Sequence, residues 1–157
     1  MLKLLTASVS IFASTIAFGQ AAEVPRSAAN GDYQSALLPG NRGMYLQDAW
    51  LVIDQDKNGL NCRHPDNHNV VVRKFDTGAI VKALGSFPVN FNGYFYNDAI
   101  DSNLPPSVEK WLIVSTLTTN PGSGNTPTDP QNPKVCVLRA NRNFIAPINI
   151  DYLPRLP

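Results

Sequence analysis

The stretch GLNCRHPDNHNVVVRKF, from Gly59 to Phe75, contains two short candidate strands with a polar turn between them. The runs GLNCR and NVVVRKF are separated by HPDNH, in which proline, aspartate and asparagine favour a turn. At the start of the stretch, Asn58-Gly59 tolerates the positive φ that turns a chain between strands. The stretch therefore predicts two β-strands joined by a turn.

Four further short runs of strand-forming residues lie on either side of this stretch. They are AWLVI (Ala49 to Ile53), AIVKAL (Ala79 to Leu84), KWLIVSTL (Lys110 to Leu117) and KVCVLRA (Lys134 to Ala140). Each run is bounded by Gly, Pro, Asn or Asp, and no convincing helical stretch separates them. Short strands at this spacing predict an all-β fold, either a sandwich or a small barrel. We expect much of the core to come from Leu60, Val71, Ile80, Val81, Leu112, Val114, Val137, Leu138 and Phe144.

The two ends of the chain differ from this β-rich region. Residues 1–21 have a lysine near the start, an apolar run and small residues at the end, which is typical of a secretory signal peptide. Residues 22–48 are rich in small and polar residues without a sustained period, and we expect a flexible leader there. The β-domain is then expected over 49–148, with a C-terminal tail over 149–157.

The charge of the chain is nearly balanced, with 13 basic and 12 acidic residues. Removal of the signal peptide takes away Lys3 and no acid, so the exported chain is close to neutral. Binding to nucleic acid or to an anionic membrane surface needs clustered lysine and arginine, and no such cluster occurs. We therefore expect neither a nucleic-acid partner nor a membrane span after signal cleavage.

Two cysteines, Cys62 and Cys136, remain in a chain that is expected to be secreted or periplasmic. In an oxidising compartment, pairing is the default. The alternative is two separate buried thiols.

The segment from Gly85 to Lys110 is rich in aromatic and turn residues and interrupts the pattern of strands. Asn92-Gly93 suggests an extra hairpin within it. Tyr94 and Tyr96 follow this turn, and alternate residues of a strand face opposite ways, so part of this aromatic surface is expected to lie away from the core. The alternative is that these aromatic residues only cover an open end of the fold. By contrast, Thr118 to Pro133 is small, polar and rich in proline and glycine, and is expected to be an exposed loop.

Asp54, Asp56 and Asn58 match the opening of a calcium-binding EF-hand loop. The twelfth position, which should carry a bidentate carboxylate, is Pro65, and the flanking runs read as strands instead of helices. A turn is the simpler interpretation, and these three residues remain a weak calcium candidate.

Catalytic machinery is hard to find in the sequence. A cysteine-dependent hydrolase would use Cys62 with His64 or His68 as base, but it needs a reduced thiolate. A zinc site at His64 and His68 lacks further ligands apart from Asp66. We expect no catalytic residues, no metal and no cofactor, with the hydrolase kept as an alternative.

The order of the motifs resembles the bacterial SH3-like (SH3b) domain. Leu60-Asn61-Cys62-Arg63 resembles its first strand, Trp111-Leu112-Ile113-Val114 its W-x-x-V element, and Cys136-Val137 its closing strand. The chain departs from the family in HPDNH, in the long insertion, and in Cys136, where tryptophan is common. Cysteines in the first and last strands fit a cross-link between strands that such a barrel brings close together.

The resemblance implies a small SH3-like barrel with a long aromatic-rich insertion and a binding role outside the cytoplasm. Its expected partner is cell-wall peptide or an envelope protein, and it implies no catalytic residues. The candidate ligand-binding residues are Tyr94, Tyr96 and Trp111. A calcium-stabilised structural envelope protein is a further alternative.

Overall fold

The computed structural model describes residues 24–118 and 135–149, which contain strands and turns and no helix. The strands are β1 (Leu37–Gly40), β2 (Gly43–Leu46), β3 (Ala49–Val52), β4 (Leu60–His64), β5 (Asn67–Phe75), β6 (Ile80–Ala83), β7 (Phe87–Phe91), β8 (Tyr94–Asp98), β9 (Trp111–Thr118), β10 (Val135–Arg139) and β11 (Ile145–Pro147). The all-β prediction is confirmed.

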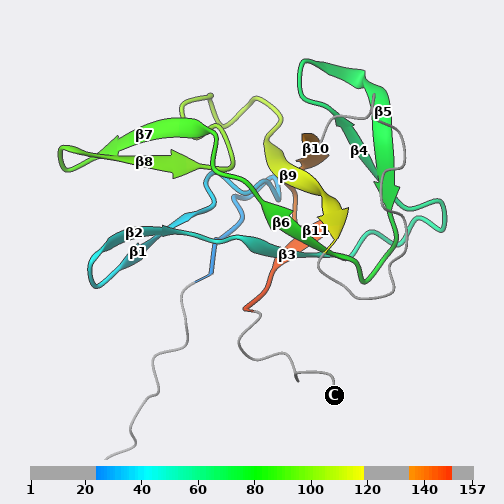
Figure 1. Cartoon of the computed structure of the whole chain (residues 1–157), viewed down its shortest axis with the longest axis horizontal. Coiled ribbons are helices and arrows are strands. Elements are labelled where there is room, and N and C mark those ends of the chain that lie inside the picture. Colours follow the sequence, from blue (N-terminus) through cyan, green and yellow to red (C-terminus); the bar gives the residue numbers. More distant parts are fainter. Residues whose placement is uncertain (1–23, 119–134, 150–157) are drawn as a thin grey trace, which may run out of the picture.

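Seven of the strands form one antiparallel sheet in the order β11-β3-β6-β9-β10-β4-β5 (Figure 1). Six of the seven, β3, β4, β5, β6, β9 and β10, correspond to the six runs predicted from the sequence. Among the described residues no pairing joins β11 to β5, so the sheet is not closed into a barrel.

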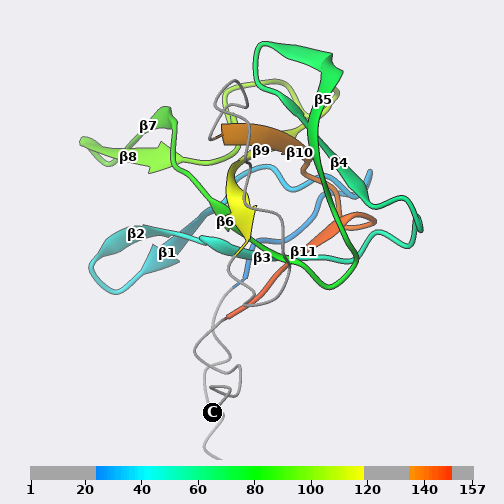
Figure 2. The same ribbon diagram turned by 45° about the vertical axis from the view of Figure 1, so that its right-hand side comes forward.

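Two hairpins project from the same side of this sheet, β1–β2 and β7–β8 (Figures 1 and 2). The β7–β8 hairpin turns at Asn92 and Gly93, whose φ angles are 51° and 83°. Positive φ at both central residues gives a turn whose twist matches that of the strands, and Asn-Gly is suited to it. The hairpin expected within the insertion is therefore present.

One apolar core fills the inside of the bent sheet. Its large, fully buried side chains include Trp50 of β3, Phe75 of β5, Leu112 of β9 and Ile145 of β11. Because strands from both edges of the sheet contribute to one cluster, the sheet bends around a single core. Leu60, Val81, Val114 and Leu138 are in it as expected. Phe144 packs against it, Val137 is buried outside it, and Ile80 is only half-buried.

Val71 is an exception to the predicted core, because it is 42% exposed. It lies on the edge strand β5, where the pairing with β4 shifts register between Cys62 and Arg63. A one-residue shift changes which face a side chain occupies. Val70 and Val71 are both left on the surface.

The segment before β3 differs from the flexible leader expected over 22–48. Its described part, from Val24 onward, contains the β1–β2 hairpin and the buried side chains of Tyr33, Ala36 and Leu38. The ring of Tyr33 packs edge-on against Trp50, with 5.0 Å between ring centroids. This segment therefore contributes to the core of the domain.

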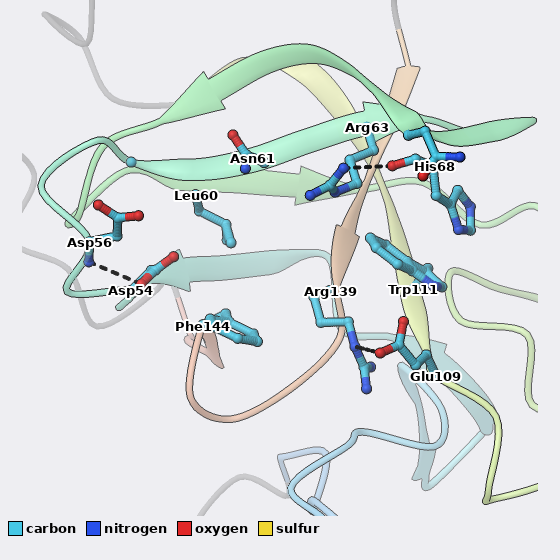
Figure 3. A pocket seen from close by; sticks show the side chains of 12 residues that line it. Asp54, Asp56, Leu60, Asn61, Arg63, His68, Glu109, Trp111, Arg139 and Phe144 are labelled. Atoms are coloured by element: carbon cyan, nitrogen blue, oxygen red, sulfur yellow. Dashed lines mark hydrogen bonds and ion pairs between the residues drawn. The ribbon is translucent and has the colours of Figure 1, made fainter.

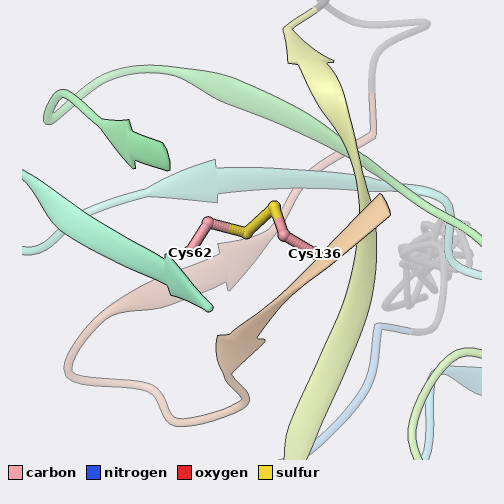
Figure 4. The surroundings of a disulfide bond; sticks show 2 residues. All are labelled: Cys62 and Cys136. Atoms are coloured by element: carbon pink, nitrogen blue, oxygen red, sulfur yellow. A yellow bond between two sulfur atoms is a disulfide. The ribbon is translucent and has the colours of Figure 1, made fainter. Parts of the chain in front are cut away.

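A disulfide joins Cys62 of β4 to Cys136 of β10, with 5.6 Å between the Cα atoms (Figure 4). Both residues are fully buried. The predicted bond is thus present, and it fits an oxidising environment.

The predicted signal peptide, almost all of the Thr118–Pro133 loop and most of the tail lie outside the described residues. Within the described ranges, no helix is long and apolar enough to cross a membrane.

Candidate functional site

The outer face of β4, β9 and β10 carries polar and aromatic side chains. In β9, Leu112 and Val114 are buried in the core, while Trp111 and Ile113 on the other face are only half-buried. Strand register places Arg139 of β10 opposite Trp111. It also places Arg63 of β4 opposite Val137 of β10. The two arginines and the tryptophan therefore share the side of the sheet that faces away from the core.

These residues line an open groove of about 550 Å³, which we call the outer-face groove (Figure 3). It is lined by Asp54, Asp56, Gly59, Leu60, Asn61, Arg63, His68, Asn69, Glu109, Trp111, Arg139 and Phe144. Figure 3 shows the two aspartates at one end and His68, Trp111 and Glu109 at the other. The groove thus has acidic side chains at both ends and arginines between them.

His68 and Trp111 form an aromatic pair at one end of the groove. Their ring centroids lie 4.3 Å apart, with the planes tilted by 41°. His68 is the second residue of β5, directly after the turn from β4. The HPDNH turn, which departs from the SH3-like pattern, therefore supplies a groove residue.

Arg139 is held in place by several neighbours. Its Nη1 and Nη2 atoms contact the two carboxylate oxygens of Asp32 at 2.9 and 3.1 Å. Nη1 also donates to the carbonyl oxygen of Lys110 at 2.8 Å, and Nε lies 3.7 Å from Glu109. The side chain of Asp32 is only 3% exposed. Arg139 thus lines the groove in a fixed position, and the carboxylates of Asp32 and Glu109 compensate its charge.

Arg63 has a different environment. Its Nη1 donates to the backbone carbonyl oxygen of His68 at 2.6 Å. No carboxylate within residues 24–118 and 135–149 lies at ion-pair distance from it. Because guanidinium has five N–H donors, Arg63 retains donors beside the groove, and no carboxylate of the described ranges compensates its charge.

Asn61 precedes Arg63 by two positions on β4 and lines the same groove. Its Oδ1 atom is buried and has no hydrogen-bond partner among the described residues. A buried polar atom without a partner loses its solvation with no compensation. This oxygen has almost no accessible surface, so the protein encloses it and a ligand donor cannot reach it in this conformation.

The weak calcium candidate forms a turn at the other end of the groove. The Oδ1 atom of Asp54 accepts from the backbone N–H of Asp56 at 3.1 Å, and Oδ1 of Asp56 accepts from that of Asn58 at 2.9 Å. In the part of the chain that is described, no three His, Cys, Asp or Glu side chains are grouped to hold a metal ion. The contacts are those of a side-chain-stabilised turn.

The residues of the proposed thiol site do not provide a free thiolate. Cys62 is bonded to Cys136, and neither is exposed. The ring of His64 contacts the turn, with Nδ1 accepting from the backbone N–H of Asp66 at 3.2 Å. In this form Cys62 cannot be a nucleophile.

The other two ligand-binding candidates lie away from the groove. Tyr94 and Tyr96 belong to the β7–β8 hairpin, which projects from the side opposite β4 and β5 (Figure 2). Tyr94 is 70% exposed and its neighbour Phe95 is 77% exposed. Tyr96 is half-buried, and its hydroxyl lies close to Gly43 of the β1–β2 hairpin. The structure therefore places Trp111 in one candidate surface and the two tyrosines in another.

Sequence reasoning identified Trp111 but not Asn61, Arg63 or Arg139 as groove residues. A signal was available in KVCVLR, where Arg139 alternates with the inward-facing Cys136 and Leu138. What was missing is the long-range register that sets β10 beside β4.

A scan against protein-family models, a search of curated proteins and a search of solved structures gave no match to this chain. The resemblance to the SH3-like family therefore stays a prediction.

Proposed function

We propose that this protein is a secreted, non-catalytic binding module whose outer-face groove holds a short segment of cell-wall peptide. The observation that carries the proposal is the position of Trp111 and His68 beside Arg63 and Asn61 in one groove. An aromatic platform next to the remaining N–H donors of Arg63 suits the recognition of a polar, extended ligand.

The size of the groove supports a short ligand over a folded protein. A volume of about 550 Å³ is in the range of small-molecule sites. A stable complex with a folded partner buries roughly 800 Å² on each side, with an apolar centre. The groove is lined by several charged side chains, so an envelope protein is the less favoured partner here.

The location and architecture implied by the SH3-like resemblance are part of the same proposal. The buried disulfide supports an extracytoplasmic site. The antiparallel succession of β3, β6, β9, β10, β4 and β5 around one core supports a relationship to small barrels, with the aromatic-rich segment from Gly85 to Lys110 as an insertion.

Retention of the signal-cleaved protein on purified bacterial sacculi tests the proposal. We expect wild type to be retained and Trp111→Ala to lose most of its retention, because the stacking surface is removed. Tyr94→Ala is the matched control, since Tyr94 is an exposed aromatic outside the groove. Both variants are first checked for an unchanged melting temperature.

Three outcomes would contradict the proposal. Loss of retention in Tyr94→Ala but not in Trp111→Ala would move the binding site to the β7–β8 hairpin. Capture from an envelope extract without any retention on sacculi would favour the protein partner. A melting temperature lowered by chelation, with the effect abolished in Asp54→Ala, would favour the calcium-stabilised structural alternative.

A further inference from the structure

We propose that the tips of the β7–β8 and β1–β2 hairpins insert into the interfacial region of a lipid bilayer and hold the domain on the membrane surface through aromatic side chains. This contact surface is separate from the outer-face groove. The bilayer is contacted from one side and is not spanned.

The β7–β8 hairpin carries three exposed aromatic rings at its tip. Phe91 and Tyr94 pair across the two strands next to the turn and are 48% and 70% exposed. Phe95 is 77% exposed. Transfer of such rings from water to a less polar medium is favourable, and tyrosine is enriched where lipid meets water. The tip therefore suits the interfacial region of a bilayer.

These rings lie on both faces of the hairpin. Phe91 and Tyr94 are directly opposite each other, so they share one face. Phe95 follows Tyr94 in β8 and therefore points to the other face. A folded partner, including a second copy of this chain, packs against one face of a hairpin, whereas a fluid bilayer surrounds the tip. Exposure on both faces therefore favours a lipid surface.

The charge pattern of the two hairpins also fits a lipid surface. Residues 85–97 contain no Asp, Glu, Lys or Arg, and residues 37–46 contain only Arg42, although 16% of the whole chain is charged. Arg42 lies exposed in the turn between β1 and β2, from which a long cationic side chain reaches lipid phosphates. Insertion of the tips therefore takes no carboxylate out of water. A single cation implies only a weak dependence on anionic lipid.

Contacts within the protein hold the two hairpins together. A Cβ at Gly43 would lie 2.6 Å from the hydroxyl of Tyr96, so β8 approaches the β1–β2 hairpin closely. At the base of the hairpins, the buried carboxylate of Asp98 accepts from the Ser35 hydroxyl at 2.5 Å and from the Ala36 N–H at 2.9 Å. The tips are therefore presented as one unit, and little order has to be gained on binding.

Co-sedimentation of the signal-cleaved protein with phosphatidylcholine vesicles tests the inference. We expect wild type to bind, and added phosphatidylglycerol to strengthen binding by no more than about fivefold, the effect of one cation. Phe95→Ala should bind about tenfold more weakly, and the double variant Tyr94→Ala/Phe95→Ala weaker still. Val70→Ala is the matched control, because it removes a 48% exposed apolar side chain from β5, on the other side of the molecule (Figure 1). It should bind as wild type.

Phe95→Trp gives a direct readout of insertion. Tryptophan is favourable where lipid meets water, so this variant should bind at least as tightly as wild type. Lipids brominated on their acyl chains should quench the emission that the variant has in addition to that of wild type. Absence of this quenching in the bound protein would overturn insertion of the tip.

Four other results would overturn the inference. These are no binding to either kind of vesicle, equal binding by wild type and the double variant, and binding that requires anionic lipid and disappears in salt. The fourth is a dimer formed without lipid that Phe95→Ala dissociates, since a second copy would then occupy the tips. Purified sacculi contain no bilayer, so their retention of the protein tests the outer-face groove separately.

Discussion

Arg139 holds both carboxylate oxygens of Asp32, with distances of 2.9 Å from Nη1 to Oδ1 and 3.1 Å from Nη2 to Oδ2. Asp32 also accepts a hydrogen bond of 2.7 Å from the side-chain amide of Asn141. The ion pair connects the segment before β1 to the last residue of β10, beside the outer-face groove. A bidentate pair of this kind fixes orientation as well as distance.

Asp32→Ala is expected to lower the free energy of unfolding by about 3 kcal/mol, because it leaves the Arg139 charge largely buried and without its main partner. Urea denaturation measures the effect. Glu109→Ala is the control, since Glu109 is 69% exposed and lies 3.7 Å from the same arginine. It should change stability by no more than about 0.5 kcal/mol. Equal effects of the two variants would contradict a structural role for the buried pair.

Cys62→Ala and Cys136→Ala should each destabilise the protein by similar amounts. The bond closes a loop with a sequence separation of 74 residues. The chain-entropy model assigns about 4 kcal/mol to a loop of this size. The double variant should be no less stable than either single one, because one bond is lost in all three. Thiol titration of the unfolded, unreduced wild type should find no free sulfhydryl; two free sulfhydryls would refute the bond.

Gly59→Ala should destabilise the protein more than Gly78→Ala. Both glycines have positive φ, 79° at Gly59 and 87° at Gly78, so the conformational cost of alanine is similar. A Cβ at Gly59 would lie 2.9 Å from the backbone oxygen of Phe75, whereas at Gly78 it would meet nothing within 4 Å. We expect a loss of about 1 kcal/mol at Gly78 and about 2–3 kcal/mol at Gly59, measured as unfolding free energies. Equal losses would show that the backbone of β5 at Phe75 shifts away from the new Cβ with no measurable loss of unfolding free energy.

The stability of the protein should fall above about pH 10 through Tyr33. Burial raises the pKa of the Tyr33 hydroxyl above its ordinary value, against the opposing charge of Arg142. The folded state then keeps this proton to a higher pH than the unfolded state. The stabilisation is therefore fully present below the unfolded pKa and is lost as the pH rises through the folded pKa.

Tyr33→Phe tests this pH dependence. The variant should lose part of the decline in unfolding free energy above about pH 10, because the hydroxyl with the raised pKa is absent. Tyr94→Phe, which removes an exposed hydroxyl, is the control. If the slope of unfolding free energy against pH is unchanged in Tyr33→Phe, Tyr33 is not the source of the decline.

Six strands of the large sheet could be predicted because their sequences are short apolar runs between turn residues. Strands β1, β2 and β11 were not predicted, since LLPG, GMYL and IAP contain proline or glycine and show no alternation of apolar and polar residues. Their pairing depends on the core that the rest of the chain forms.

The groove could be predicted only through Trp111. Its other members come together through the register of β10 against β4 and through the position of His68 over Trp111. Both are long-range relationships, which local patterns of residues do not contain. Val71 shows the same limit, because a register shift in β4–β5 decides which side it faces.

The disulfide joins β4 to β10, two neighbouring strands of the sheet. Between β10 and β4 the described pairing consists of Val137 with Arg63, whereas β10 and β9 are paired over five positions. The groove residues on the β4–β5 side of this boundary are Asn61, Arg63 and His68, and those on the β9–β10 side include Trp111 and Arg139. Leu60 and Phe75 from one side share the apolar core with Leu112 and Leu138 from the other. The disulfide therefore adds a covalent link to this apolar contact, and it ties the two sides of the groove together from beneath.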